Sequence, residues 1–380
     1  MEDPQQSQEN QPIRTGEQVS ANKKIPALIG VGTLLLLIGL VAILIGYQQP
    51  QTEGGLYERS LSVGTTEELK VLAENAKNLR QTTNSPEEKA RLTIFESFLR
   101  LNFDRPGSTE LLRGLASDTA YSNTLRALAV QMLADFYMIH RRNIVDAEDI
   151  FVGEPYKNFP EVSAEGTPLY YKAIRKVYEY STSINSLPVS EYRIAEWYLS
   201  ILETADLTPE NRTELLSIAE KRYARGNTAL PAFAEWVGTS PLFGQTLGYA
   251  KWLQAAVLGR IALARSDGAM LTEAETKFKN IITELTAHGD NLYWDAQSAW
   301  ANLEYALFLQ RAYGAKRASD ISETLGKILT APQAVGAYLN NLQFANDKNP
   351  FAQADALEVK ALAAYDTAFA QYLRSIGWKI

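Results

Sequence analysis

The residues that could support catalysis or metal binding are few and scattered along this sequence. The chain contains two histidines, His140 and His288, and no cysteine. A zinc site or a Ser-His-Asp triad would depend on these imidazoles, and a thiol nucleophile is absent. No phosphate-binding loop, nucleophile elbow, zinc helix or acidic calcium loop occurs in the sequence. We therefore expect no catalytic residue set, no cofactor and no metal, and we expect His288 to lie at a helix end.

One glutamate has the neighbours that some glycan-cleaving enzymes use. Phe95-Glu96-Ser97-Phe98 resembles the Glu-Ser step of lytic transglycosylases, some of which are helical and act on the cell wall. That resemblance implies a buried Glu96 that donates a proton to the glycosidic oxygen. The glycine-rich segment that follows in those enzymes is missing, and Glu96 is expected on the solvent face of its helix. We predict that the chain is not an enzyme, with a wall-active enzyme as a remote alternative.

A group of aromatic side chains is suited to binding rather than to catalysis. Tyrosine and tryptophan offer a large contact area at low entropic cost, and they are common in protein interfaces. We predict a partner-binding surface formed by Trp236, Phe243, Trp294, Trp300 and Tyr305. The alternative is that these aromatics fill the core between helices.

Composition narrows the class of partner. The 380-residue chain has a formal net charge of −7, and its one tight basic cluster is His140-Arg141-Arg142. Binding to a phosphate backbone needs a basic face, so we expect no nucleic-acid partner. With 46% hydrophobic and 10% aromatic residues, the chain has enough apolar side chains for a large core.

The spacing of apolar residues predicts an all-α protein, because they recur every three or four residues in segment after segment. Ser85-Pro86-Glu87-Glu88 begins one such segment with an N-cap serine, a proline at the first helical position and a glutamate that can close a capping box. Thr208-Pro209 has the same arrangement of an N-cap residue followed by proline, and Thr272 is expected to start another helix. The expected helices cover residues 66–80, 86–102, 108–117, 122–140, 145–151, 167–184, 189–204, 209–225, 245–266, 272–287, 292–313, 317–330, 332–344 and 351–376.

Short connections join most of these helices, which favours antiparallel neighbours and, for so many pairs, a stacked solenoid. The segment 226–248 is rich in glycine, proline and aromatic residues and is predicted to be a long loop. The expected divisions are a disordered cytoplasmic tail (1–24), a transmembrane helix (25–46), a linker (47–65), a first helical-repeat half (66–225), the loop (226–248) and a second helical-repeat half (249–380).

Residues 25–46 form a long apolar stretch without charge. About 22 residues at 1.5 Å each make a helix of roughly 33 Å, which is long enough to cross a bilayer. The stretch is longer than the core of a cleavable signal peptide, which is the alternative, and we predict an uncleaved single-pass anchor. Lys23 and Lys24 precede it and only Arg59 follows closely, so we expect a cytoplasmic N-terminus and a domain outside the cytoplasmic (inner) membrane.

Small residues recur along one face of this expected span. Gly32, Gly39 and Gly46 recur every seven residues. Ala42 lies between the last two on the same face, so another helix could approach closely along this stripe. We therefore expect packing between transmembrane helices here, either in a homo-oligomer or with a partner. The alternative is that glycine is simply common in membrane helices.

The segment Leu258 to Leu285 resembles a tetratricopeptide repeat. In that family a Leu-Gly pair and a small residue on the first helix let the second helix pack closely, and an Ala-x-x-x-Phe step fills the neighbouring groove. Here these positions are held by Leu258, Gly259, Ala262, Ala274 and Phe278. In the next pair Trp300 and Leu303 keep the spacing, but Glu304 stands where the family has glycine. The resemblance implies an irregular α-solenoid, with its repeat-like part at 258–330.

The expected layout is a short cytoplasmic tail, one span and an outward helical-repeat domain. It resembles that of the ancillary Sec-translocon subunit of bacterial inner membranes, whose members act as protein-binding adaptors. The resemblance implies a membrane-anchored interaction adaptor or scaffold of the cell envelope, with protein partners there. The alternative is a permanent structural subunit of an envelope machine, such as a secretion, pilus or division apparatus.

Overall fold

The computed structural model describes residues 52–139, 169–288, 292–332 and 350–380. Leu61, Ser62 and Gly64 are excluded from the first of these ranges, and Val335, Gly336 and Leu339 are described in addition. Within these residues all regular secondary structure is helical and no strand occurs, so the predicted all-α class is confirmed. None of the helices in these ranges has the length and apolar character needed to cross a membrane.

Several sequence predictions fall on residues outside these ranges. They include the anchor at 25–46, with its stripe of Gly32, Gly39, Ala42 and Gly46, the tail at 1–24 and the helix at 145–151. They stay predictions. Residues Thr52–Ile380 form one unit by their mutual contacts.

The helices begin and end close to the positions expected from the sequence. They are α2 (Glu53–Ser60), α3 (Thr66–Thr82), α4 (Pro86–Arg100), α5 (Arg105–Ser117), α6 (Asn123–Ile139), α8 (Leu169–Ile184), α9 (Pro188–Thr204), α10 (Pro209–Val237), α11 (Gly244–Arg265), α12 (Gly268–Thr286), α13 (Leu292–Tyr313), α14 (Ala318–Ile328), α16 (Pro350–Leu362) and α17 (Thr367–Ser375), with the 3-10 helices η2 (Pro241–Phe243) and η3 (Gly314–Arg317).

Local capping explains several of these boundaries. The Ser85 side chain accepts a hydrogen bond from the backbone N–H of Glu88 at the start of α4, and Thr208 caps α10 in the same way. The prediction that Thr272 starts a helix is wrong, because α12 begins one turn earlier. There Asp267 Oδ1 accepts hydrogen bonds from Ala269 N and Met270 N, at 2.9 and 3.0 Å.

The predicted loop at 226–248 is largely helical. Helix α10 continues through Gly226 and Pro231 to Val237, and after a short turn η2 leads directly into α11. Both residues usually weaken or end a helix. Here Gly226 lies against the Tyr192 ring of α9, so the missing side chain allows the two helices to approach closely. Packing along α9 therefore outweighs the local preference of the sequence.

Two further segments differ from the expected pattern. The predicted linker at 47–65 contains α2, whose Leu56 is fully buried in a cluster with Leu72, Leu92 and Leu99. The helix predicted at 351–376 is divided into α16 and α17 by a turn at 363–366. Asp366 ends this turn, and its Oδ1 accepts a hydrogen bond from Phe369 N at 2.8 Å to start α17.

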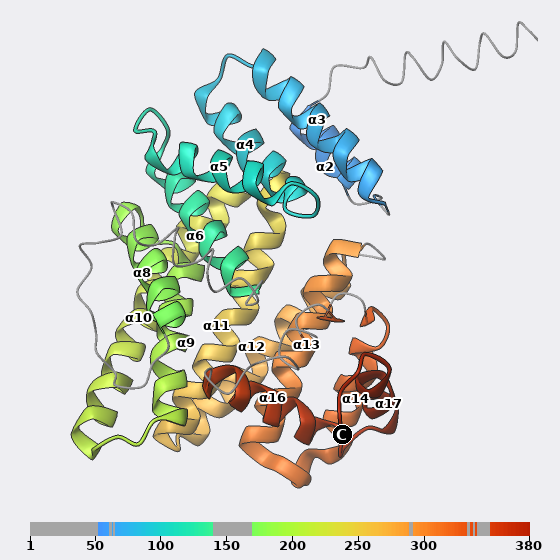
Figure 1. Ribbon diagram of the computed structural model, residues 1–380. Helices are drawn as coiled ribbons and strands as arrows, with labels where there is room; N and C mark the ends of the chain where they lie inside the picture. The colour runs from blue at the N-terminus through green and yellow to red at the C-terminus, as the bar shows by residue number, and fades with distance from the viewer. Residues whose placement is uncertain are drawn as a thin grey trace, which may run out of the picture. The chain divides into compact units, whose positions relative to one another are not determined.

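Consecutive helices pack on one another along the chain. From α3 to α6 and from α8 to α14, each helix contacts the next one in sequence, and α11 also contacts both α9 and α13. Figure 1 shows α11 between α9 and α13, with α16 running across these helices. Contacts between neighbours, repeated along the chain, are typical of helical-repeat architectures.

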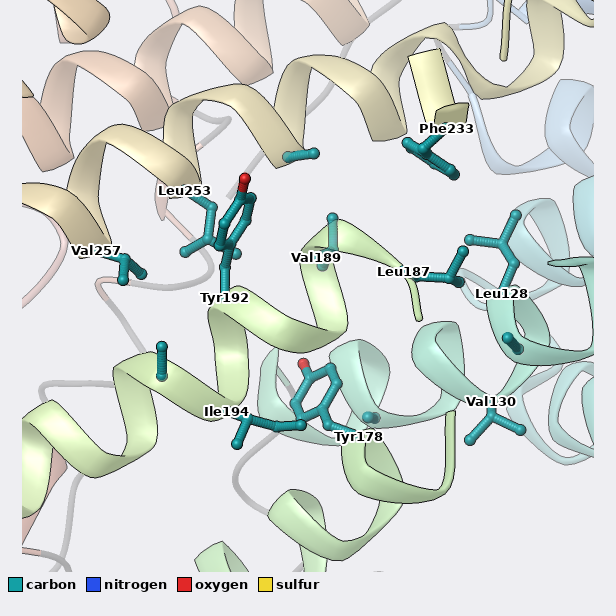
Figure 2. Packing of buried hydrophobic residues seen from close by; sticks show 14 of the residues in the cluster. Leu128, Val130, Tyr178, Leu187, Val189, Tyr192, Ile194, Phe233, Leu253 and Val257 are labelled. Atoms are coloured by element: carbon teal, nitrogen blue, oxygen red, sulfur yellow. The ribbon is translucent and has the colours of Figure 1, made fainter. Parts of the chain in front are cut away.

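Apolar side chains hold these helices together in three buried clusters. The largest joins α4, α5, α6, α8, α9, α10, α11, α12 and the first half of α13, and the second joins helices from α11 to α17. Figure 2 shows part of the first cluster, with the Tyr192 ring of α9 beside Leu253 of α11. Burial of such side chains is the main favourable term in folding.

The residues that resemble a tetratricopeptide repeat meet where α11, α12 and α13 join. A Cβ atom on Gly259 would lie 2.6 Å from Phe308 Cδ2 and 3.7 Å from Ala274 Cβ. The Phe278 ring is fully buried, with its centroid 5.4 Å from that of Tyr305 and 5.5 Å from that of Phe308. Gly259 thus permits close packing of the three helices.

Candidate functional site

The structure places the five aromatic residues predicted to bind a partner within or against the core. Phe243, Trp294 and Tyr305 are 3%, 8% and 7% exposed, and Trp236 and Trp300 are partly buried against the same clusters. Trp236 stacks on Phe243 with a centroid distance of 5.0 Å. These contacts join helices, so Phe243, Trp294 and Tyr305 belong to the core rather than to an exposed docking surface.

The five aromatics also do not form one site. Phe243 and Trp294 lie in the first core cluster, with Trp236 packed against it. Tyr305 lies in the second cluster, and Trp300 packs against both. His288, which follows the end of α12, stacks on Trp294 with a centroid distance of 3.9 Å. The burial of Phe243, Trp294 and Tyr305 agrees with packing between helices, and partner binding by the partly buried Trp236 and Trp300 stays a prediction.

Glu96 is fully buried, so the expectation that it faces solvent is wrong. Its two carboxylate oxygens accept hydrogen bonds from Arg80 Nε of α3 at 3.0 Å and from Arg100 Nε at 2.8 Å. A carboxylate held by two guanidinium groups has neither oxygen free to carry a proton to a leaving group. This geometry suits a structural ion pair between α3 and α4.

Charged side chains are instead concentrated on neighbouring faces of α9, α11 and α13. We call this set the charged row, and it consists of Arg193, Glu196 and Glu203 of α9, Arg260 of α11, and Glu304 and Arg311 of α13. Residues three, seven or ten apart on a helix share one face. The row therefore follows from sequence spacing within each helix and from the packing of α11 between α9 and α13.

Arg260 is the centre of the charged row. Its Nε donates to Glu203 Oε1 at 2.9 Å and its Nη2 donates to Ser200 Oγ at 2.9 Å, while its Nη1 lies 3.7 Å from Glu196 Oε1. Burial acts to raise the pKa of Glu203, but the Arg260 guanidinium outweighs it and holds that pKa below its usual value. The Glu203 side chain is 43% exposed, so solvent screens part of this attraction.

The charged row ends in an ion pair with α16. Arg311 Nε donates to Glu358 Oε1 of α16 at 2.8 Å, and Arg311 Nη2 pairs with Glu358 Oε2. Burial disfavours the charged guanidinium, but the bonds to Glu358 raise the pKa of Arg311 above its usual value. This pair fixes one side of α16 against α13.

Glu304 is the unusual member of the row. It makes no hydrogen bond or ion pair to another residue of the described ranges, and its neighbours include the carboxylates of Glu196 on α9 and Asp355 on α16. Burial, and then the Glu196 charge, raise the pKa of Glu304 to about 7, although Arg311 and Arg193 act in the opposite direction. The row thus contains a carboxyl group that titrates near neutral pH.

We expect the Glu304→Gln variant to be more stable than the wild type above pH 7. An unfolded chain releases this proton near pH 4.5, whereas the folded chain keeps it up to about pH 7. The wild type therefore loses stability as pH rises through this window, by up to about 1.4 kcal/mol per pH unit. Melting temperatures from pH 5 to pH 8 measure this slope, which the variant should largely lack. The exposed Glu235→Gln is the matched control, and an unchanged slope in Glu304→Gln would contradict the assignment.

A buried polar cluster lies next to the charged row and shares Arg193 with it. Tyr178 and Tyr249 donate hydrogen bonds to Asp135 Oδ1, at 2.6 and 3.2 Å, and Arg193 Nε donates to the Tyr249 hydroxyl at 2.7 Å. Burial raises the pKa of Asp135, against the opposing charge of Arg193. These contacts tie α6, α8, α9 and α11 together, and they suit a structural role because every polar atom named has a partner inside the cluster.

No group of residues in the described ranges has the composition of a metal site. Sequence reasoning missed the charged row because its members come from three helices. One signal was available: Arg193, Glu196, Ser200 and Glu203 recur on one face of α9, whose other residues are nearly all buried. Comparisons with protein family models, with curated proteins and with solved structures found no match to this chain.

Proposed function

We propose that this chain is a membrane-anchored adaptor or scaffold of the bacterial cell envelope that binds polypeptide partners through an extracytoplasmic helical solenoid. One observation carries the proposal. The face formed by α9, α11 and α13 is lined with charged side chains, and a helix, α16, lies across it and is held by the Arg311–Glu358 pair. A surface that accommodates one helix through charge pairs and apolar anchors has the chemistry of a helix-binding face.

The packing around Gly259 supports a solenoid that resembles tetratricopeptide repeats. In that family the residue at this position allows close approach of the next helices, and here Gly259 lies against Phe308 and Ala274. Glu304, which stands where the following repeat of the family would have glycine, is instead a member of the charged row, beside the charges of Glu196 and Arg311. The solenoid is therefore proposed to be irregular and specialised around this row.

The membrane location rests on the sequence alone. The uncharged stretch at 25–46 and the preceding Lys23 and Lys24 support a single span with a cytoplasmic N-terminus. Gly32, Gly39, Ala42 and Gly46 support contact with another membrane helix, in a homo-oligomer or a partner. This layout resembles the ancillary Sec-translocon subunit, whose adaptor role agrees with the proposal.

A crosslinked pull-down of the full-length protein from native membranes tests the proposal, with a control that lacks residues 1–50. We expect a reproducible set of envelope proteins that is lost or altered in the control. Recovery of the protein without partners would contradict the adaptor. If the partners stay bound in one large complex after detergent extraction and do not exchange, the chain is instead a permanent structural subunit.

A further inference from the structure

Charged residues are scarce in one stretch of the chain. Residues 226–250 contain a single charged side chain, Glu235, whereas the 21% share of the whole chain would place about five in 25 residues. The stretch covers the last part of α10, η2 and the start of α11. We call residues 231–248 the η2 corner. The exposed members among its described residues are Pro231, Ala232, Glu235, Gly238 and Thr239, so small side chains and one carboxylate form its outer surface.

Two larger apolar side chains also reach the surface of the η2 corner. Trp236 stacks on Phe233 and on Phe243, with centroid distances of 5.8 and 5.0 Å. Leu242 packs against the buried cluster that contains Leu56. These contacts leave Trp236 and Leu242 partly exposed. Tryptophan and leucine side chains are typical of protein surfaces at the boundary between water and lipid, so the η2 corner has the composition of an interfacial surface.

Helix α2 is fixed beside this corner. The Glu53 carboxylate accepts hydrogen bonds from Ser240 Oγ at 3.3 Å and from Arg91 Nε of α4 at 2.9 Å. Leu56 is fully buried, and α2 contacts both α3 and η2. Helix α2 is therefore part of the folded unit, and its first residue, Glu53, lies next to the η2 corner.

The chain between the predicted membrane span and α2 is short. The span is predicted to end at Gly46, and the seven steps from there to Glu53 extend over at most about 25 Å. The headgroup layer accounts for about 5–8 Å of this distance. A compact unit of the length of Thr52–Ile380 is roughly 50 Å across. Such a span would hold the side of the unit that carries Glu53 toward the bilayer, and this is the side of the η2 corner.

We propose that the η2 corner rests on the headgroup layer of the membrane, with Trp236 and Leu242 at the level of the lipid interface. This inference rests on the membrane anchor of the proposed function and adds a second contact with the bilayer. The partner is the phospholipid surface itself. The contact removes water from small and apolar side chains, and Glu235 is the one charged residue of the corner whose hydration it affects.

The nature of the contact follows from the same residues. The η2 corner contains no lysine or arginine, so its binding depends on apolar area rather than on attraction to anionic lipids. Such a contact changes little with salt, whereas attraction between charges is screened as ionic strength rises. Because the anchor keeps the corner near the surface, a weak contact is sufficient. The solenoid then keeps one orientation relative to the membrane.

The test uses the full-length protein in vesicles of phosphatidylethanolamine and phosphatidylglycerol, with a nitroxide quencher on the headgroup of an added phospholipid. The chain has no cysteine, so Thr239→Cys and Thr272→Cys each accept one fluorescent label. Both threonines are exposed, but Thr272 lies about 20 Å along α12 from Leu285, which is next to Gly248. We expect quenching about twofold or more stronger in Thr239→Cys, at low and at high salt, because its label lies at the headgroup level.

A charge added to the η2 corner gives a second measurement. Ala232 and Ala224 are both exposed residues of α10, about 12 Å apart along the helix, and only Ala232 belongs to the corner. In the Thr239→Cys protein, Ala232→Glu should lower the quenching by about half or more, because a carboxylate resists loss of its hydration. The matched Ala224→Glu should leave it unchanged. Circular dichroism should show the same helix content for both variants, since both sites are exposed.

The outcomes separate this contact from the anchor. Equal quenching in Thr239→Cys and Thr272→Cys, quenching that is lost at high salt, or no effect of Ala232→Glu would overturn the contact. Alkaline carbonate extraction of the vesicles tests the anchor by itself. A protein that stays in the membrane but shows no quenching in Thr239→Cys would overturn the contact and leave the anchor intact. Release of the protein by carbonate would contradict the anchor and, with it, this inference.

Discussion

The Asp135→Ala variant is expected to unfold with a free energy about 3–5 kcal/mol lower than that of the wild type. Asp135 is the shared acceptor of the Tyr178 and Tyr249 hydroxyls, which come from α8 and α11. Removing the carboxylate leaves two buried hydroxyls without this acceptor. It also takes away one of the negative charges near Arg193, which keeps its ion pair with Glu196. Four helices meet at this cluster, so the loss should weaken the whole unit rather than one helix.

Urea-induced unfolding of the full chain in mild detergent, followed by tryptophan fluorescence, measures this effect. Asp135→Asn should lose less, because the amide keeps an acceptor for Tyr178 while removing the charge. The exposed Asp206→Ala is the matched control and should change stability by no more than about 0.5 kcal/mol. Equal stability of Asp135→Ala and the wild type would show that the cluster contributes nothing net to folding.

The second large effect is expected from the Gly226→Ala variant, with a net loss of about 1–3 kcal/mol. A Cβ atom at this position would lie 2.4 Å from Cε1 of Tyr192, closer than real Cβ contacts allow. The Tyr192 ring cannot move aside freely, because it is fully buried and its hydroxyl donates to Asn227 Oδ1 at 2.8 Å. The strain should exceed the gain of up to about 1 kcal/mol that alanine gives inside a helix.

The same substitution in an open place gives the control. Gly326 lies inside α14 with no atom within 4 Å of a Cβ built there, so Gly326→Ala should stabilise the protein by about 0.5–1 kcal/mol. A double-mutant cycle with Tyr192→Leu separates the contact from the helix preference. Opposite signs for the two glycines are expected; a stabilising Gly226→Ala would mean that α9 and α10 are not packed as closely as described.

Most helix boundaries were predictable because the signals that set them are local. An N-cap side chain such as Ser85 or Thr208 bonds a backbone N–H only three residues away, and the spacing of apolar residues marks the helix that follows. The same local signals predicted the boundaries of α9 and α13 to within one residue. It was less reliable where a second cap lay nearby, as with Asp267 ahead of Thr272.

The candidate site could not be predicted to the same degree. Trp294 and Tyr305 have residue types that suit either an interface or a core, and only their neighbours in space place them in the core. Arg260 and Arg311 are ordinary helix residues in the sequence. Their role depends on Glu203 and Glu358, which lie 57 and 47 residues away along the chain.

The sequence by itself determined that this chain is helical and where most helices start, because capping and periodicity act over three or four residues. The tertiary structure decided the rest. Helix α10 continues through Gly226 and Pro231, and the last predicted helix is divided into α16 and α17. Glu96 is buried, with hydrogen bonds from two arginines. The tertiary structure also set α16 across α9 and α13. Each of these depends on contacts between distant residues, whose combined free energy outweighs the small local preferences that a sequence pattern records.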